Sequence, residues 1–220
     1  WVGRYAVPAI LRPPPRPISG YSTLLGRQSW LVPPPQILRF ATKIAGAADQ
    51  LTNLVNRMTE AAQLGAVDKK LDMQIEPVHI ISAVEIAVTM LTFNVEQKIA
   101  YDIDPELWIS ADATRFREVL SNLLENAIKY STSESHVYLT ATATTLFEAA
   151  RLLPDDQFDP ALLDQGDPPV VLLRVQDQGE GVEPDDQQRI FEKFVRAPRS
   201  LTTPVRGSGL GLYICRRYVE

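Results

Sequence analysis

Two asparagines and a lysine lie at spacings of four and three residues within the segment 120–130. Asn122, Asn126 and Lys129 would therefore share one face of a helix, while the apolar residues of the segment occupy another. Amide oxygens beside an ammonium group suit a metal-bound polyphosphate, because Mg²⁺ takes oxygen ligands and shares them between protein and phosphate. A solvated polar helix face is the simpler alternative for this segment taken alone.

Two glycine-rich segments follow further along the chain. Residues 175–182 read VQDQGEGV, so an aspartate and two glycines come directly after an apolar stretch. A buried carboxylate at such a place can accept a hydrogen bond from a ring amine, and an ordinary turn is the alternative. Residues 207–212 read GSGLGL before a predicted helix, whose N-terminal N–H groups attract anions. This second segment fits neither the dinucleotide pattern G-x-G-x-x-G nor the P-loop, and a flexible loop is its alternative.

The elements that must position these residues mix helices with strands. Helices are predicted over 36–64, 78–94, 113–130 and 185–194 and from about 209 onwards, and strands over 98–103, 107–110, 136–144 and 170–175. Asp112 has the residue type and position of an N-cap for the helix 113–130. We expect 66–77 to be a connector, 146–169 to be an irregular acidic stretch, and 170–175 to be a central strand. The mixture predicts an α+β fold that contains a two-layer α/β sandwich with helices on one face of an apolar sheet.

The segment 36–64 carries a seam of apolar residues at alternating spacings of four and three. The seam consists of Ile37, Ala41, Ile44, Ala48, Leu51, Val55, Met58 and Ala62. This heptad pattern is typical of coiled coils and helical hairpins, and it favours dimerisation. Gly65 is a natural helix stop. The prolines between 13 and 17 would kink or break a helix, so a proline-rich linker or partner-binding segment is an alternative for the first 35 residues.

Composition restricts the class of protein. A chain of 220 residues with 45% hydrophobic and 22% charged residues indicates one or two globular domains. The net charge of −5 argues against a general nucleic-acid binder. The single cysteine, Cys215, excludes an intrachain disulfide framework and a multi-cysteine metal site. No apolar run is long enough to span a bilayer, and the start without methionine indicates a piece of a longer protein, so we expect membrane contact only through parts missing from this chain.

In their order and spacing these segments resemble the ATP-binding domain of sensor histidine kinases. This domain belongs to the GHKL superfamily, which includes Hsp90-type chaperones, type II topoisomerases and MutL-like repair ATPases. Residues 122–129 match the N box, 177–181 the first glycine box, 190–194 the F box and 207–212 the second glycine box. The resemblance covers residues 78–220 and implies a Bergerat-type sandwich that binds Mg-ATP. We therefore expect a helical hairpin over 1–70 and a C-terminally incomplete ATP-binding domain over 71–220.

The resemblance implies a role for each matched residue. Asn126 would be the Mg²⁺ ligand, Asp177 would bind the adenine amine, and Asn122 and Lys129 would lie near the phosphates as the catalytic candidates. The further ATP-binding residues that it implies are Tyr130, Gly179, Gly181, Arg196, Arg199, Gly207, Gly209, Leu210 and Gly211. Among these, the glycines of the second box would wrap the phosphates, and the two arginines would belong to a mobile lid over 195–208. Phe191 and Phe194 are expected to be packing residues.

The region before the heptad helix resembles the phosphoacceptor hairpin of the same family in a damaged form. Counting back from Gly20-Tyr21 aligns residues 9–14, AILRPP, with the family motif H-E-L-R-T-P. Ala9 then stands in place of the phosphoacceptor histidine, and Ile10 in place of its acidic neighbour. Neither can act as a nucleophile or orient one. His79 and His136 fall in the ATP-binding domain, where we expect a capping or packing role for His79 and a structural or solvent-exposed position for His136.

Three functions remain open at this level. The first is a histidine-kinase-type two-component signalling protein that binds Mg-ATP and phosphorylates a partner in trans, because self-phosphorylation on histidine is not expected. The second is a pseudokinase, a regulatory ATP-binding dimer without phosphotransfer. The third, a simple ATPase of the wider superfamily, is disfavoured by the hairpin. The expected partners are a second copy in a homodimer and a response regulator or another kinase, and the expected location is cytoplasmic, within a larger sensor.

Overall fold

The computed structural model describes residues 15–28, 33–65, 72–91, 99–132, 135–152, 164, 166–196 and 207–219. Ala9 and Arg199 lie outside these residues, so the expected phosphoacceptor position and one expected phosphate contact stay predictions. The described residues form two compact units. One unit contains those before residue 70 together with 188–196 and 207–214, and the other contains 72–187 and 215–219 with the gaps given above.

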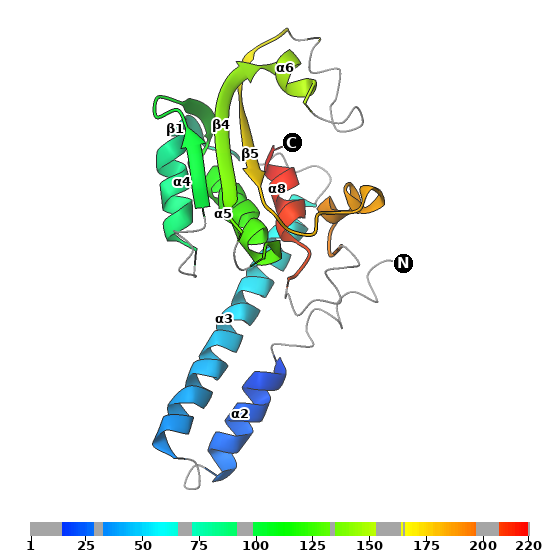
Figure 1. Cartoon of the computed structure of the whole chain (residues 1–220). Helices are drawn as coiled ribbons and strands as arrows, with labels where there is room; N and C mark the ends of the chain where they lie inside the picture. The colour runs from blue at the N-terminus through cyan, green and yellow to red at the C-terminus, as the bar shows by residue number, and fades with distance from the viewer. Residues whose placement is uncertain are drawn as a thin grey trace. The chain divides into compact units, whose positions relative to one another are not determined.

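The first unit contains a pair of helices, α2 (Pro15–Gln28) and α3 (Pro34–Leu64), which lie side by side (Figure 1). The rings of Tyr21 and Phe40 stack at 5.0 Å between centroids, and Lys43 Nζ donates to the Tyr21 hydroxyl at 3.1 Å. A linker is therefore the wrong interpretation for the α2 segment. The proline cluster marks the start of a helix, because a proline in the first turn gives up no intrahelical hydrogen bond.

The long helix α3 confirms the heptad prediction. It begins at Pro34, two residues before the predicted start, and Gly65 caps its C-terminus as expected. The Gly65 N–H donates to the carbonyl oxygens of Ala61 and Ala62 at 3.2 and 3.3 Å. Its φ of −93° lies in the right-handed region, so the backbone at this position does not itself demand glycine.

The second unit contains two small sheets. Strand β1 (Ile75–His79) pairs antiparallel with β3 (Trp108–Asp112). The second sheet has the order β2 (Ile99–Ile103), β4 (Val137–Thr145) and β5 (Pro169–Gln176), in which β2 and β4 are parallel and β4 and β5 antiparallel. The α+β class is confirmed, and so are the strands at 98–103, 136–144 and 170–175. Among the described strands β4 is central and β5 lies at an edge, so the expectation of a central strand at 170–175 was wrong.

Two predictions fail around the first sheet. Residues 75–79 form β1 instead of a connector, and the following helix α4 (Ile80–Thr89) is shorter than the predicted 78–94. Pro77 lies within β1, opposite Ser110. A proline is tolerated there because β1 pairs with only one described strand, so the missing N–H can lie on the unpaired side.

Three further elements differ from the prediction. The expected helix at 185–194 is replaced by two short 3₁₀ helices, η4 (Pro184–Asp186) and η5 (Arg189–Phe191). The stretch expected to be irregular begins with a short helix, α6 (Leu146–Ala150). The last helix, α8 (Gly211–Val219), begins at Gly211, within the glycine-rich segment and two residues after the predicted start.

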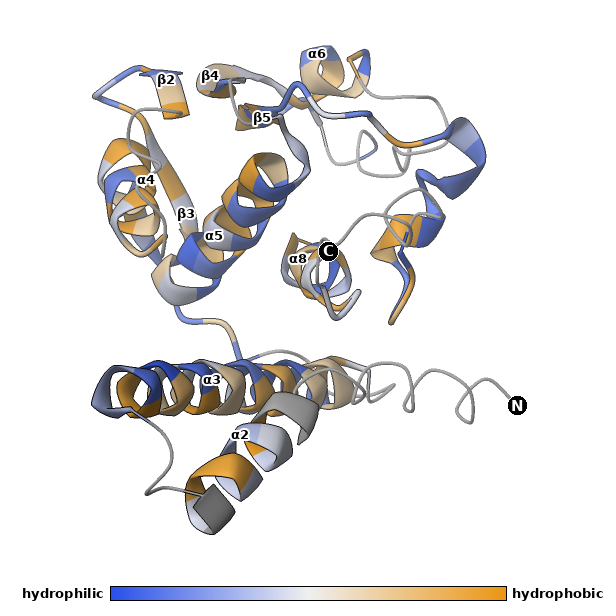
Figure 2. Cartoon of the chain, turned by 60° about the horizontal axis from the view of Figure 1, so that its bottom comes forward, coloured by the Kyte–Doolittle hydropathy of each residue, from blue (hydrophilic) through white to orange (hydrophobic). Residues whose placement is uncertain are grey.

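The core of the second unit lies between two helices and the strands. Figure 2 shows α4 and α5 (Ala113–Tyr130) on one side of β2, β4 and β5. The largest side chains buried completely in this core are Ile80, Val84, Leu120, Leu124, Val137 and Leu139. The sequence predicts an apolar stripe for α5 at Phe116, Leu120, Leu123 and Ala127. This stripe is confirmed at Leu120 and Ala127, but Leu124 is buried where Leu123, which is half-buried, was predicted. Removing these side chains from water is the main force that holds α5, and with it the predicted N box, against the sheet.

Asp112 fixes the start of α5 as predicted. Its Oδ1 accepts the backbone N–H groups of Thr114 and Arg115, each at 3.0 Å, and its Oδ2 accepts the N–H of Gln74 at 3.1 Å. These bonds, above all the one from Arg115, lower the pKa of the Asp112 carboxyl below its ordinary value of 3.8. Their contribution to stability is complete above that ordinary value and is lost as the pH falls through the lowered pKa.

Asp112→Ala is expected to lower the free energy of unfolding at pH 7 by about 1–2 kcal/mol, because the helix cap and the bond to Gln74 both disappear. Asp112→Asn is the matched control, since asparagine caps a helix about as well but cannot titrate. Urea unfolding of the three proteins measures the effect. The difference between wild type and Asp112→Ala should shrink as the pH falls through the lowered pKa of the carboxyl. Equal stability at pH 7 would contradict the capping role.

Candidate functional site

The C-terminal half of α5 carries the first predicted group of site residues. Asn122 is only 4% exposed. Asparagine is usually exposed in folded proteins, so this burial sets Asn122 apart from an ordinary solvated helix position.

The other residues of the predicted N box lie further along the same helix. Asn126 and Lys129 are half-buried, and Tyr130, the last residue of α5, is 38% exposed. The Lys129 ammonium lies 5.2 Å from the centroid of the Tyr130 ring. The polar face predicted from the spacing is therefore present, and it runs from an enclosed amide at Asn122 to an exposed aromatic ring at Tyr130.

The first glycine box forms a tight turn directly after β5. The Gly179 N–H donates to Asp177 Oδ1 at 2.7 Å, and Gly181 has a φ of +73°, in the left-handed region that favours glycine. Asp177 is exposed, so the expectation of a buried carboxylate was wrong. One of its oxygens is held by the turn, which leaves the other to accept a hydrogen bond from a ligand.

The structure brings the N box and the first glycine box into direct contact. A Cβ atom placed on Gly179 would lie 2.6 Å from the carbonyl oxygen of Tyr130. Only glycine therefore permits this approach between the end of α5 and the turn after β5. Ser131, which the sequence analysis did not single out, follows at the same place with a buried hydroxyl that has no hydrogen-bond partner among the described residues. Its position directly after the N box was the only available signal.

The second glycine box and the F box meet within the other unit. The Phe194 N–H donates to the Gly209 carbonyl oxygen at 2.9 Å, and a Cβ on Gly209 would lie 2.8 Å from the carbonyl carbon of Phe194. Both residues have positive φ, +64° for Phe194 and +69° for Gly209. Phe194 therefore has a backbone role beyond the predicted packing.

The remaining predicted residues of this segment have varied surroundings. Leu210 is completely buried, Gly207 is exposed, Arg196 is half-buried, and Gly211 is the first residue of α8. As nucleotide contacts they stay predictions.

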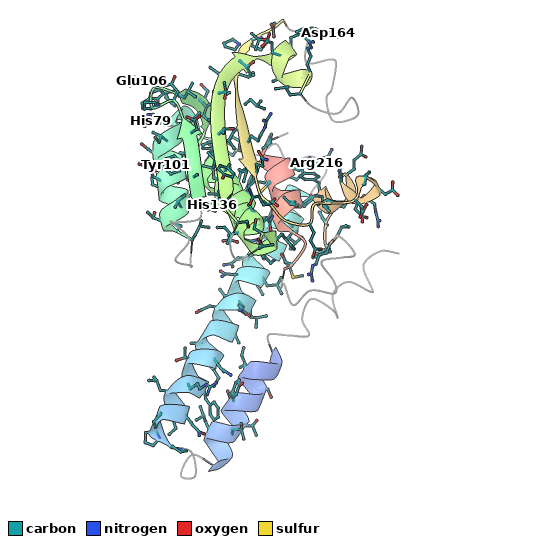
Figure 3. The ribbon with its side chains drawn as sticks, viewed as in Figure 1. His79, Tyr101, Glu106, His136, Asp164 and Arg216 are labelled. Carbon is teal, nitrogen blue, oxygen red and sulfur yellow. The ribbon has the colours of Figure 1, made fainter. Side chains whose placement is uncertain are left out.

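The two histidines have the structural surroundings expected for them. His79 Nε2 donates to the Pro105 carbonyl oxygen at 2.6 Å, because a carbonyl can only accept, and Nδ1 forms a hydrogen bond with the Ser82 hydroxyl at 2.8 Å. The His79 ring stacks on Trp108 with 4.7 Å between centroids. His136 is exposed just before β4, away from His79 (Figure 3).

Within the described ranges, no three His, Cys, Asp or Glu side chains are grouped so that they could hold a metal ion. Among the helices that the structure describes, none has both the length and the apolar character needed to cross a membrane.

Comparison with known protein families gives one match that covers half of the chain. The family described as histidine kinase-, DNA gyrase B-, and HSP90-like ATPase matches residues 111–220. Every residue of the predicted nucleotide site lies within this range.

Curated relatives and solved structures point the same way. The adaptive-response sensory kinase SasA of Parasynechococcus marenigrum (strain WH8102) is 37% identical over 128 residues, which are 58% of this chain and 27% of that protein. The chain spans about a quarter of the length of the curated relatives it matches. Full-length ShkA in complex with AMPPNP is similar with a TM-score of 0.59 and 26% identity, over 97% of this chain and 39% of that one. The fold is also that of ThkA in its complex with the response regulator TrrA, with a TM-score of 0.61 and 18% identity, over 97% of this chain and 52% of that one.

Proposed function

The chain belongs to the family of histidine kinase-, DNA gyrase B- and HSP90-like ATPases, and from this premise we propose that it is a histidine-kinase core that binds Mg-ATP. The observation that carries the proposal is the junction of α5 with the turn after β5. There the Ser131 hydroxyl is buried without a hydrogen-bond partner among the described residues, and glycine alone fits at position 179, between Asp177 and the Tyr130 carbonyl. Polar groups without partners beside a close backbone approach are typical of a ligand site.

Asp177 is the proposed recognition residue for adenine. Its Oδ1 is held by the Gly179 N–H, and this bond fixes the direction of the other carboxylate oxygen. That oxygen would accept a hydrogen bond from the exocyclic amine of adenine. Guanine carries a carbonyl oxygen at the corresponding position and cannot donate there, so we propose selectivity for ATP over GTP.

Asn126 is the proposed protein ligand of the metal ion. Its amide oxygen is a hard donor on a half-buried helix face, which fits Mg²⁺, and Mg²⁺ usually takes few ligands from protein and the rest from phosphate and water. When bound, Mg²⁺ neutralises phosphate charge. Asn122 and Lys129 lie on the same helix as Asn126, and the lysine ammonium would pair with phosphate oxygens. Gly207, Gly209 and Gly211, at the N-terminus of α8, would donate backbone N–H groups to the phosphates.

Thermal unfolding tests the nucleotide proposal. Mg-ATP is expected to raise the midpoint temperature, because a ligand that binds only the folded state stabilises it. ATP without Mg²⁺ should raise it less, and Mg-GTP should leave it unchanged. Equal shifts with Mg-ATP and Mg-GTP would contradict the assignment of Asp177 to adenine.

We further propose that residues 1–70 form a dimerisation hairpin that pairs with a second copy of the chain. The heptad seam of α3 is incompletely covered by α2, since Val55 is 50% and Ile37 36% exposed, and the neighbouring Leu38 is 72% exposed. Figure 2 shows apolar residues recurring along the whole of α3. A second identical seam is the partner that matches this repeat over its full length.

Val55→Glu is expected to convert the dimer to a monomer in analytical ultracentrifugation, because it buries a charge in the proposed seam. Asn53→Glu adds the same side chain at an exposed position off the seam and should leave the dimer intact. A wild-type chain that sediments as a monomer, or equal behaviour of both variants, would contradict the proposed pairing.

The phosphate acceptor is proposed to lie on another polypeptide, a response regulator or another kinase. The position that matches the acceptor histidine is Ala9, which offers no nucleophile. Radiolabelled ATP is therefore expected to leave the isolated chain without acid-labile, base-stable phosphate. The double variant Ala9→His/Ile10→Glu restores the nucleophile and its acidic neighbour and is expected to gain such a label. Label on the unmodified chain would overturn this assignment.

A further inference from the structure

The C-terminal turn of helix α3 has no positively charged side chain of its own to stabilise it. The last turn of a helix carries carbonyl oxygens without intrahelical partners and the negative end of the helix dipole, and a nearby cation stabilises it. The last turn of α3 contains no basic residue. A cation that stabilises the negative end of this 31-residue helix must therefore come from another segment that lies near Gly65.

Lys193, from the distant F box in the same unit, supplies a cation at this place. A Cβ atom on Gly65 would collide with Lys193 Nζ, so the ammonium lies directly against that glycine. The same Nζ lies 4.9 Å from the centroid of the Tyr213 ring, in the first turn of α8. Three segments far apart in the sequence therefore meet at one ammonium group. Because φ at Gly65 suits any residue, the space for Lys193 explains why this position carries no side chain.

The residue after Lys193 is fastened to the second glycine box. Phe194 donates its N–H to the Gly209 carbonyl, and the two backbones approach so closely that Gly209 has no room for a side chain. Val195 contributes to the same contact, since its carbonyl oxygen would lie 2.8 Å from a Cβ on Gly209. If residue 193 moved, the tightly packed backbone contact between residues 194 and 209 would therefore move residue 209 as well.

We propose that Lys193 is a positioning residue that couples the end of α3 to the second glycine box, so that the hairpin adjusts nucleotide affinity. The ammonium is attracted by the C-terminus of α3 and by the Tyr213 ring, and it fixes the Phe194–Gly209 contact that presents the glycine box. The effect on nucleotide rests on the proposed function, in which Gly207, Gly209 and Gly211 bind phosphate. The junction itself does not rest on it.

The sharpest probe is Gly65→Ala, which alters neither the lysine nor any proposed nucleotide contact. The new methyl group collides with the flexible end of Lys193, and its other near neighbour is the Ala61 carbonyl oxygen at 3.2 Å, so a small adjustment lets the chain fold normally. Gly46→Ala is the matched control, because a Cβ at Gly46, in the same helix, meets nothing within 4 Å. The variants Lys193→Ala and Gly65→Ala/Lys193→Ala complete a double-mutant cycle, and Lys193→Arg tests rescue by another cation.

Two readouts separate the junction from the nucleotide site. Hydrogen exchange of the Phe194 amide, measured by NMR without nucleotide, should speed up in Gly65→Ala and in Lys193→Ala but not in Gly46→Ala. Affinity for Mg-ATP should fall about fivefold in the same two variants. In the double variant, amide exchange should be no faster and Mg-ATP affinity no lower than in either single variant, since the methyl group has no ammonium left to displace. Lys193→Arg should recover part of the affinity that Lys193→Ala loses.

Effects of Gly65→Ala that are equal with and without Lys193, or a Phe194 amide unchanged in Lys193→Ala, would overturn the proposal. Faster exchange without a change in affinity would also overturn the coupling to nucleotide. If the wild-type chain binds no Mg-ATP, the proposed function fails, whereas the exchange measurements still decide whether Lys193 holds the junction.

Discussion

Asn126→Ala is expected to abolish Mg²⁺-dependent binding of ATP, with the affinity falling at least about 100-fold. The substitution removes the only side-chain oxygen proposed to bind the ion. Folding should survive, because Asn126 is only half-buried and alanine is the most favourable residue in a helix. Calorimetric titration with a non-hydrolysable ATP analogue, with and without Mg²⁺, measures the loss.

The matched control is Glu125→Ala, at the adjacent exposed position of α5. It removes a charged side chain from the same helix without touching the proposed ligand, so Mg-ATP affinity should stay close to that of the wild type. Wild-type affinity in Asn126→Ala would exclude this residue as the metal ligand. A large residual affinity that no longer responds to Mg²⁺ would instead show that the base and the phosphates are bound without the ion.

Asp177→Asn is expected to lower ATP affinity by about 10- to 100-fold, the value of a hydrogen bond to a charged acceptor. The turn should persist, because the asparagine oxygen can still accept the Gly179 N–H that now bonds to Asp177 Oδ1. The other group of the side chain changes from an accepting oxygen to a donating NH₂ group. The NH₂ group and the adenine amine are both hydrogen-bond donors, so neither can bond to the other and each is left without a partner.

The same change predicts a gain for a different base. Inosine triphosphate carries a carbonyl oxygen where ATP carries the amine, so the NH₂ group of Asp177→Asn can donate to it. The ratio of ATP to ITP affinity should therefore fall in the variant, by titration of both nucleotides into both proteins. A loss that is equal for ATP and ITP would mean that Asp177 supports the turn and does not read the base.

Elements stabilised by neighbours in the sequence could be predicted closely. The N-cap at Asp112, the apolar stripe of α5 and the heptad seam of α3 all depend on residues within a few positions of one another. Strand β1 was missed because its pairing with β3 joins residues 29 to 37 positions apart, and Pro77 argues locally against a strand. The edge position of β5 likewise depends on the order of strands, which no local pattern reveals.

In the candidate site, too, local features could be predicted from the sequence and features set by distant residues could not. The types and spacing of Asn122, Asn126 and Asp177 were visible in the sequence, but their surroundings were not. Asn122 is buried because α5 packs against the sheet, although asparagine is usually exposed. Asp177 is exposed because its turn with Gly179 projects beyond the end of β5.

The close approaches in the site are tertiary features. The contact of Gly179 with the Tyr130 carbonyl and that of Lys193 with Gly65 both join distant segments. No spacing of residue types could have indicated either of them. They account for glycine at two positions where the sequence showed only a turn and a helix stop.

Titration calorimetry of the unmodified chain with a non-hydrolysable ATP analogue tests the proposed nucleotide site most directly. We predict binding that is strong with Mg²⁺, much weaker without it, and undetectable for the GTP analogue under the same conditions. No heat of binding with the ATP analogue in the presence of Mg²⁺, from a chain shown by its cooperative unfolding to be folded, would contradict the assignment of a nucleotide site to α5 and the turn after β5.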